Sequence, residues 1–336
     1  MSLDTPKPKG PLAIEPLDPQ VKSIQPGGGA CMRIELAWGR LRRCYLKTFR
    51  RGYLARMEAT RQGDTNRCPH EVLDPRDLKF YRNQGGYSWK PEHDPFVWRE
   101  HLPFVREGLA ELELLFGLFA ALAIGLGLVR WWLALGPAVL ALLVVWFFRN
   151  PRRIGPEGAG LVVSPADGKV VAIEEVAFDE FVQGPAVVIG IFLSIFNVHI
   201  NRMPVAGRVI GVRYRPGKFL NALLAASARE NEQLALRIEE SGPPHRRMVV
   251  RQIAGQFARR IVCFAAPGEE FARGARFGMI KLGSRTELVL PREPGLAIRA
   301  TIGQRVKAGT TILAGYALAN GELANGGPAD CGTETP

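Results

Sequence analysis

The sequence predicts an α+β fold in which a mainly β domain is preceded by a hydrophobic membrane hairpin. Residues 114–148 carry a single charge, Arg130, and such a long uncharged run is typical of membrane helices. After Pro151 the chain changes to short runs rich in Val and Ile, separated by Gly, Pro and Asp-Gly, which is typical of strands joined by turns. With 336 residues, 47% of them hydrophobic, the chain is neither a small disulfide-stapled fold nor globally disordered.

The first segment, residues 1–32, is rich in Pro and Gly and is predicted to be a disordered leader. It contains no apolar run typical of a secretory signal. The five cysteines are scattered and lack a Cys-x-x-Cys pair, so we expect neither a disulfide framework nor a zinc site. The formal net charge of +12 favours binding to a nucleic acid or to an anionic membrane surface.

Residues 33–105 form a basic extension of unknown role. Its first part, residues 33–61, holds nine Lys and Arg against two Glu. Apolar residues recur there at helical spacing: Ile34, Trp38, Leu41, Tyr45, Phe49 and Tyr53. This pattern predicts a basic amphipathic helix, which either packs on its own domain or lies on an anionic membrane surface. Cys68, His70 and His93 have neither the number nor the spacing of metal ligands, so no metal site is predicted.

Residues 106–150 are predicted to anchor the chain in a membrane as a hairpin. Arg130 divides the apolar part into residues 114–129 and 131–148, and each piece is slightly shorter than the roughly 20 residues that a spanning helix needs. Arginines flank both ends, and three tryptophans of the second piece suit the membrane interfaces. The positive-inside rule then places both ends in the bacterial cytoplasm. A buried hairpin in a soluble protein is the alternative.

Residues 151–320 are predicted to form a β-rich domain, followed by a loose tail of residues 321–336. One helix is expected within the domain, from about residue 219 to residue 240. The strand candidates are residues 161–163, 169–173, 186–195, 197–200, 209–212, 248–253, 261–264, 279–290 and 311–317.

Three polar residues of this domain form a set that can activate a hydroxyl group. Ser284 follows Gly283 in the predicted strand 279–290 and shares a strand face with apolar neighbours. His199 is the only histidine on a predicted strand of the domain, and Asp167 lies in a turn. An acid that orients a histidine, and a histidine that takes the proton of a serine, together produce a nucleophile. Each residue also has a structural explanation, as a Gly-Ser bulge, a hydrogen-bonded histidine or an Asp-Gly turn.

Five groups of residues, in this order, resemble the short bacterial and archaeal phosphatidylserine decarboxylases. They are Ser-Pro-Ala-Asp-Gly-Lys-Val (164–170), Phe-Asn-Val-His-Ile-Asn-Arg-Met-Pro (196–204), Pro-Gly-Lys-Phe-Leu-Asn-Ala (216–222), Gln-Ile-Ala-Gly with Ala-Arg-Arg-Ile-Val-Cys (252–255 and 258–263), and Arg-Phe-Gly-Met-Ile-Lys-Leu-Gly-Ser-Arg (276–285). The resemblance covers about residues 145–318, and the hairpin before it is also similar to that of the family. The helix expected after Asn221 lacks an acidic-basic pair of the family pattern, and residues 1–105 have no counterpart there.

The resemblance implies a catalytic domain that cleaves itself between Gly283 and Ser284. In the family scheme, Asp167 orients His199, which takes the proton of Ser284 so that its oxygen attacks the Gly283 carbonyl. β-Elimination and hydrolysis then leave two chains, residues 1–283 and 284–336, with Ser284 converted to a covalent pyruvoyl cofactor. The implied activity is the decarboxylation of phosphatidylserine to phosphatidylethanolamine and CO2 in phospholipid biosynthesis, without a metal.

The same resemblance suggests how the substrate is held. Lys218, at the start of the expected helix, is expected to meet the lipid phosphate, and Asn221 to contact the substrate. The expected partners are a membrane phospholipid substrate, an anionic membrane surface and the two self-cleaved chains, with no nucleic acid and with a homo-oligomer left open. The catalytic domain is expected on the cytoplasmic side of the bacterial cytoplasmic membrane.

Two other functions stay open at this point. The turns at residues 164–168 and 303–309 also resemble those of lipoyl-type carriers, which suggests a membrane-tethered, β-rich binding or carrier-like module without catalysis. This module would lack a lysine-centred attachment turn and would leave Gly283-Ser284 unexplained. The other is a serine hydrolase that uses Ser284, although no Gly-x-Ser-x-Gly elbow surrounds that serine. An ether-lipid analogue of phosphatidylserine also stays open as the substrate.

Overall fold

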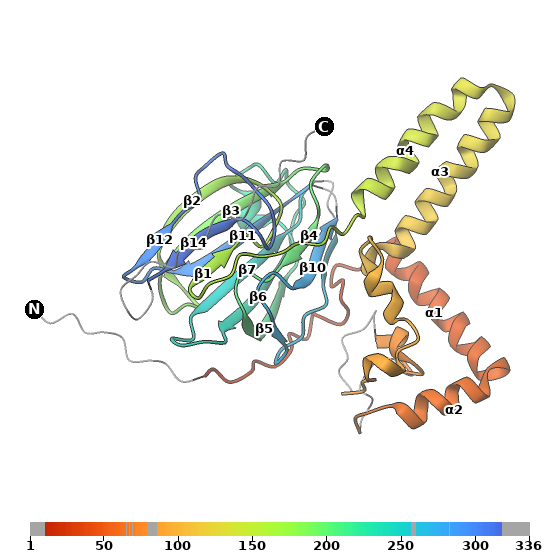
Figure 1. Ribbon diagram of the computed structural model, residues 1–336, viewed down its shortest axis with the longest axis horizontal. Helices are drawn as coiled ribbons and strands as arrows, with labels where there is room; N and C mark the ends of the chain where they lie inside the picture. The colour runs from red at the N-terminus through yellow and green to blue at the C-terminus, as the bar shows by residue number, and fades with distance from the viewer. Residues whose placement is uncertain are drawn as a thin grey trace, which may run out of the picture. The chain divides into compact units, whose positions relative to one another are not determined.

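The structure is a computed structural model that describes residues 11–64, 66, 68, 70–78, 86–256, 260–281 and 283–317. The chain divides into two compact units (Figure 1). The helical unit is Gln20–Arg152, and the β-rich unit is Arg153–Pro336 together with Met1–Pro19. The predicted tail, residues 321–336, lies outside the described residues.

The beginning of the described chain differs from the predicted disordered leader. Residues 11–19 run along strand β5 (Gly207–Arg215), where the Glu15 N–H donates to a backbone carbonyl at 2.8 Å. The Glu15 carboxylate pairs with Arg213 at 2.8 Å and with Arg237 at 2.7 Å. These contacts fix a Pro-rich segment that has no regular secondary structure of its own.

The basic extension begins with two helices, where its spacing predicts a single one over residues 33–61. Helices α1 (Ala30–Phe49) and α2 (Arg51–Thr60) meet at Arg50, whose φ of −127° interrupts the helical backbone. Short 3-10 helices follow, which are η1 (Pro75–Leu78), η2 (Pro91–His93), η3 (Val97–His101) and η4 (Arg106–Gly108).

The hydrophobic segment forms a helical hairpin whose two arms lie side by side (Figure 1). It consists of α3 (Leu109–Val129), the 3-10 helix η5 (Trp131–Ala134) and α4 (Leu135–Phe147), with the break at Arg130 as predicted. Arg106–Val129 is long and apolar enough to cross a membrane by length and composition, whereas Trp131–Phe147 is a shorter apolar helix. Only 6% of the most apolar window of the longer helix is buried, which differs from the buried hairpin of the alternative prediction.

The β-rich unit is built from antiparallel sheets, and one short helix, α5 (Ser227–Glu230), interrupts its strands. Among the described residues an eight-stranded sheet has the order β13-β2-β3-β11-β7-β6-β5-β9, and two three-stranded sheets have the orders β1-β14-β12 and β4-β10-β8. The remaining strands are β1 (Leu161–Val163), β2 (Gly168–Asp179), β3 (Gly184–Leu193), β4 (Ile200–Arg202), β6 (Gln233–Glu240), β7 (Arg247–Ile253), β8 (Arg260–Cys263), β9 (Glu270–Phe271), β10 (Arg276–Lys281), β11 (Ser284–Pro291), β12 (Leu296–Ile298), β13 (Arg305–Val306) and β14 (Ile312–Tyr316).

Strand β11 lies at the centre of the large sheet. All eight of its residues are buried, between β3 on one side and β7 on the other. Ser284, its first residue, pairs with Leu193 at the end of β3. The ladders on both sides fix the backbone of β11 along its length.

One predicted strand is wrong in its extent. Residues 279–290 form the end of β10 and most of β11, which belong to different sheets. The chain turns between them at Gly283, whose φ is +60°. This left-handed backbone is readily accessible to glycine, and it ends one strand before the next begins.

The predicted helix at residues 219–240 is also wrong. Only α5 is helical there, and β6 occupies the last third of the range. Leu234, Leu236 and Ile238 alternate with period two and are fully buried, which fits one face of a strand. Because β6 pairs with both β5 and β7, the sheet stabilises the strand over a helix.

Candidate active site

The peptide between Gly283 and Ser284 lies where the chain passes from β10 to β11. His199 stands directly before β4, which pairs with β10, and it is 1% exposed. The His199 carbonyl accepts from the Ile280 N–H at 3.1 Å, and the Gly283 N–H lies 3.3 Å from His199 Nε2. The small sheet thus brings the predicted histidine against the predicted cleavage site.

The hydrogen bonds of His199 define its tautomer. Nδ1 lies 2.8 Å from the carbonyl oxygen of Asn197, which can only accept, so Nδ1 carries the proton. Nε2 therefore keeps a lone pair, and it accepts from the Gly283 N–H. A neutral imidazole whose basic nitrogen faces this backbone can act as a general base there.

Ser284 is fully buried, and its Oγ has no hydrogen-bond partner among the described residues. Leaving a buried hydroxyl unpaired costs about 1–3 kcal/mol. Such groups are rare in native structures and call for an explanation, for which a reactive role is one class. The unpaired hydroxyl directly after the residue that contacts His199 is therefore a candidate nucleophile.

Two glycines shape the backbone around this peptide. A Cβ added to Gly283 would meet no atom within 4 Å, so the left-handed φ explains this glycine, and crowding in the uncleaved chain does not. Gly255, shortly after β7, is explained by a close approach. A Cβ there would lie 2.1 Å from the Gly283 carbonyl oxygen and 3.1 Å from the carbonyl carbon. Sequence reasoning missed this role, although the Gln-Ile-Ala-Gly motif contains Gly255.

Asn231 holds the backbone beside Gly255. It is fully buried, accepts from the Leu220 N–H at 2.8 Å, and donates to the carbonyls of Leu220 and Ala254 at 2.9 and 2.7 Å. This amide therefore ties the loop around Leu220 to the residue before Gly255. No local signal indicates this role, because Asn231 falls inside the predicted helix.

Asp167 is placed differently from the expectation that it orients His199. One of its oxygens pairs with Arg153 Nη2 at 2.7 Å, and the other accepts from the Ala308 N–H at 2.7 Å. Arg153 also donates to the Ala308 carbonyl at 3.2 Å. Within the described part of the chain, Asp167 makes no hydrogen bond to His199, whose Nδ1 is bound to a backbone carbonyl. The carboxylate therefore fixes its own turn against the segment of Ala308.

Arginines give the surroundings of Asp167 a positive charge. Burial lowers the pKa of Arg202 to about 10, and the nearby guanidinium groups of Arg153 and Arg276 act in the same direction. Asp167 acts in the opposite direction, as a counter-ion. Removing its carboxylate would leave these positive charges facing one another, so Asp167 stabilises the cluster electrostatically.

A buried polar network connects the three elements that carry the predicted acid, histidine and serine. Asn201 of β4 donates to the Pro165 carbonyl at 3.3 Å and to Thr286 Oγ1 of β11 at 3.1 Å. Gln252 of β7 donates to Asn201 Oδ1 at 2.9 Å. Since Pro165 belongs to the turn that contains Asp167, this network fixes that turn relative to β4 and β11.

Lys218 and Asn221 lie in the irregular segment after β5. The Lys218 side chain is 69% exposed and pairs with Glu230 at 2.8 Å, a hydrogen bond that raises the pKa of the lysine. Asn221 is exposed, and its side chain accepts from the Leu223 N–H at 3.0 Å. No helix begins at Lys218, so helix amides cannot assist it in binding a phosphate.

Two further features lie apart from these residues. Within the described ranges, no group of three or more His, Cys, Asp or Glu side chains could hold a metal ion. A cavity of about 650 Å³ lies beside Glu240, Arg246 and Arg273, and it is lined by none of the predicted site residues.

Comparison with known proteins identifies the family. A sequence model described as phosphatidylserine decarboxylase matches residues 140–314. The phosphatidylserine decarboxylase proenzyme of Rhodopirellula baltica is 55% identical over 239 residues, which is 71% of this chain and 99% of the relative. Proenzymes of the same name from Syntrophus aciditrophicus and Symbiobacterium thermophilum are 41% identical over 222 residues and 44% identical over 219 residues, covering 66% and 65% of this chain and 98% and 95% of the relatives. Because relatives are matched almost from end to end, the chain belongs to the phosphatidylserine decarboxylase family.

Proposed function

We propose that this chain is a proenzyme that cleaves itself between Gly283 and Ser284 and then decarboxylates phosphatidylserine to phosphatidylethanolamine and CO2. The names of its relatives supply the reaction and the precursor state. The observation that supports the assignment to residues is the buried, unpaired Ser284 Oγ next to a glycine that contacts the basic nitrogen of His199. A carrier-like module and a serine hydrolase do not account for the family match.

The cleavage step is an acyl shift from nitrogen to oxygen. His199 Nε2 takes the proton of Ser284 Oγ, and the oxygen attacks the carbonyl carbon of Gly283. The bond between that carbon and the Ser284 nitrogen breaks, and the nitrogen receives the proton and becomes a free amine. Loss of the Ser284 Cα proton then breaks the Cβ–Oγ bond, so that Oγ leaves as part of the Gly283 carboxylate. Hydrolysis of the resulting dehydroalanine releases ammonia and leaves the pyruvoyl carbonyl.

The backbone around the peptide supports this step. Gly255 lets the Gly283 carbonyl lie close to the backbone that follows β7, and Asn231 holds this backbone through the Ala254 carbonyl. Asp167 serves as a positioning residue, because it fixes the turn that the Asn201 network joins to β4 and β11. The burial of Ser284 also keeps water away from the ester until elimination occurs.

The covalent pyruvoyl group supplies the electron sink for decarboxylation. Ser284 fits its formation, because its hydroxyl is unpaired and because the strand that it begins pairs with β3 along its whole length and with β7 from Arg285 to Val289. His199 is then placed to return a proton to the substrate carbon that loses CO2. The exposed Lys218 can exchange its contact with Glu230 for the lipid phosphate, and Asn221 lies in the same loop.

The hairpin supports a membrane location for this reaction. With 21 residues, α3 is about 31 Å long, close to the roughly 30 Å of the hydrocarbon core. We place the hairpin in the bacterial cytoplasmic membrane, with both ends and the β-rich unit on the cytoplasmic side, because arginines flank both ends. The substrate then lies in the same membrane as the anchor.

Denaturing electrophoresis with mass measurement tests the proposal. The purified protein is expected as two chains, residues 1–283 and 284–336, with the smaller one blocked by pyruvoyl at its amino terminus. It is expected to release CO2 from phosphatidylserine vesicles, whereas Ser284→Ala gives one inactive chain. A single wild-type chain of full mass with a free Ser284 hydroxyl would overturn the proposal. Two chains without decarboxylation of this lipid would overturn the substrate assignment alone.

A further inference from the structure

Helix α1 directs its apolar side outward. Ile34, Trp38, Leu41, Tyr45 and Phe49 are between 52% and 71% exposed. At about 100° per residue they lie within roughly a quarter of the helix circumference, so they form one outer apolar stripe. A helix of a soluble protein normally turns such a stripe toward its core. The helical unit instead leaves the stripe uncovered.

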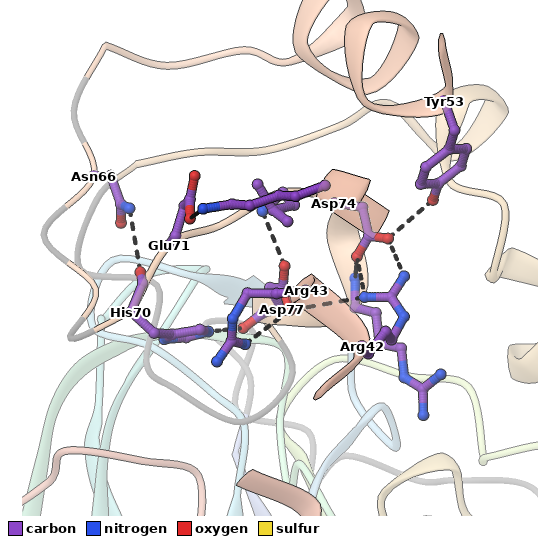
Figure 2. A network of polar contacts seen from close by, with 11 residues as sticks. Arg42, Arg43, Tyr53, Asn66, His70, Glu71, Asp74 and Asp77 are labelled. Atoms are coloured by element: carbon purple, nitrogen blue, oxygen red, sulfur yellow. Dashed lines mark hydrogen bonds and ion pairs between the residues drawn. The ribbon is translucent and has the colours of Figure 1, made fainter. Parts of the chain in front are cut away.

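The inward side of α1 buries Met32 and Leu46, and ion pairs of Arg42 and Arg43 hold the helix in this orientation (Figure 2). Arg42 binds both carboxylate oxygens of Asp74, and Tyr53 of α2 donates to the same carboxylate at 2.9 Å. Arg43 pairs with Asp77 at 3.2 Å. Both aspartates are buried, so separating these pairs would leave uncompensated carboxylates inside the unit. Helix α1 therefore cannot rotate to bury its apolar stripe without losing this network.

Basic residues border one side of the stripe. Arg33, Arg40 and Lys47 follow one another at intervals of seven residues and are exposed. Lys47 pairs with Glu71 at the surface, and α2 adds the exposed Arg51. An apolar stripe that contains Trp and Tyr and has a basic border is typical of helices lying in an anionic membrane interface. The aromatic rings suit the depth of the lipid headgroups.

We propose that α1 lies in the interface of an anionic phospholipid bilayer. The outer apolar stripe then contacts the upper parts of the acyl chains, and the basic border contacts the phosphates. An antiparallel contact with a second copy of this chain suits the stripe less well, because it would bring two like-charged borders together. The same helical unit also carries a helix long and apolar enough to cross a bilayer by length and composition. A lipid bilayer is therefore the partner that we assign to the stripe.

This surface is an addition to the family fold. The family match begins at residue 140, and the relative from Rhodopirellula baltica is matched over 99% of its length by 239 residues of this chain. Most of the unmatched chain therefore precedes residue 140, where α1 lies. The contacts of this extension do not involve Gly283, Ser284 or His199.

Depth-dependent fluorescence quenching in the full chain tests the proposal. The five native cysteines are replaced by serine, and an NBD label is attached at Leu41→Cys or, as a control, at Phe178→Cys in β2, since both residues are 65% exposed. The proteins are placed in nanodiscs of phosphatidylcholine, with or without phosphatidylglycerol, that carry nitroxides on the acyl chains. With phosphatidylglycerol, we expect the label at Leu41→Cys to be quenched by the nitroxides and shielded from iodide. The control label is expected to stay accessible to iodide.

A second set of variants separates the stripe from general attraction to the membrane. With the label at Tyr45→Cys, the double change Trp38→Glu and Leu41→Glu is expected to abolish nitroxide quenching, whereas Phe178→Glu preserves it. Self-cleavage into two chains reports that each variant is folded, independently of where α1 lies. Equal iodide access at the two label positions in both lipids would overturn the proposal. So would shielding at Leu41→Cys that appears without lipid and grows with protein concentration, because it would indicate a second copy.

Discussion

Adding one methyl group at Gly255 is expected to slow self-cleavage about 100-fold. The new Cβ would lie 2.1 Å from the Gly283 carbonyl oxygen, whereas real Cβ atoms essentially never approach closer than 3.0 Å. One of the two must therefore move by about 1 Å, and the Ala222 Cβ at 3.4 Å limits how far the methyl group can retreat. A misplacement of about 1 Å at a reacting group costs on the order of 100-fold in rate.

The assay follows newly synthesised chain by denaturing electrophoresis and measures the fraction cleaved with time. Gly184→Ala at the start of β3 is the matched control, because an added Cβ there would meet nothing within 4 Å. Thermal unfolding of Gly255→Ala in a Ser284→Ala background compares the stability of uncleaved chains. A similar Tm with and without Gly255→Ala would assign the slower cleavage to the position of the carbonyl.

Two results would refute this reasoning. If Gly255→Ala cleaves at the wild-type rate while folded, the Gly283 carbonyl tolerates the displacement and its position does not limit the rate. If the slower cleavage is accompanied by a large loss of Tm in the uncleaved background, the glycine serves folding and not the reaction. A slow Gly184→Ala control would show that any added methyl group impairs maturation.

Three further substitutions test Ser284, Lys218 and Glu232, a buried residue whose carbonyl accepts from the Ala254 N–H beside Gly255. Ser284→Ala is expected to abolish cleavage, because it removes the buried hydroxyl that attacks Gly283, and a second chain on denaturing electrophoresis would contradict that role. Burial raises the pKa of Glu232 above its ordinary value, so the folded state holds this proton more tightly and stability is lost as pH rises through the folded pKa. Glu232→Gln is therefore expected to raise Tm at pH 7 more than at pH 4. An equal change in Tm at both pH values would show that the pKa of Glu232 is not raised in the folded state. Lys218→Ala is expected to raise the KM for phosphatidylserine by no more than about fivefold, since exposed ion pairs contribute little to binding in water, and an unchanged KM would remove its role.

The parts of the fold that follow from local pattern could be predicted from the sequence. The single Arg130 in an apolar run predicted the break of the hairpin, and the helical spacing of apolar residues predicted α1. Short Val-rich runs predicted strands such as β1 and β7. Each of these elements is indicated by a local feature of its own residues, either helical spacing or a short apolar run.

The wrong predictions concern segments whose structure is determined by contacts with distant parts of the chain. The apolar residues around Leu220 and Leu224 have helical spacing, and they run into the period-two pattern of β6, so the two were merged into one predicted helix. The alternation around Gly283 continues from β10 into β11, and only the membership of the two strands in different sheets separates them. Arg153 and Ala308 bind Asp167 from distant parts of the chain, which no local pattern can indicate.

The sheet topology explains how a cleaved chain can keep a working site. After cleavage, β11 and β14 belong to residues 284–336, but β11 is paired with β3 and β7, and β14 is paired with β1 from the larger chain. The hydrogen bond from Ala308 to Asp167 also joins the two chains. Breaking the peptide after Gly283 therefore removes none of the ladders that hold β11. In the proposed mechanism, the pyruvoyl group therefore stays at the start of β11, beside the segment that His199 contacts.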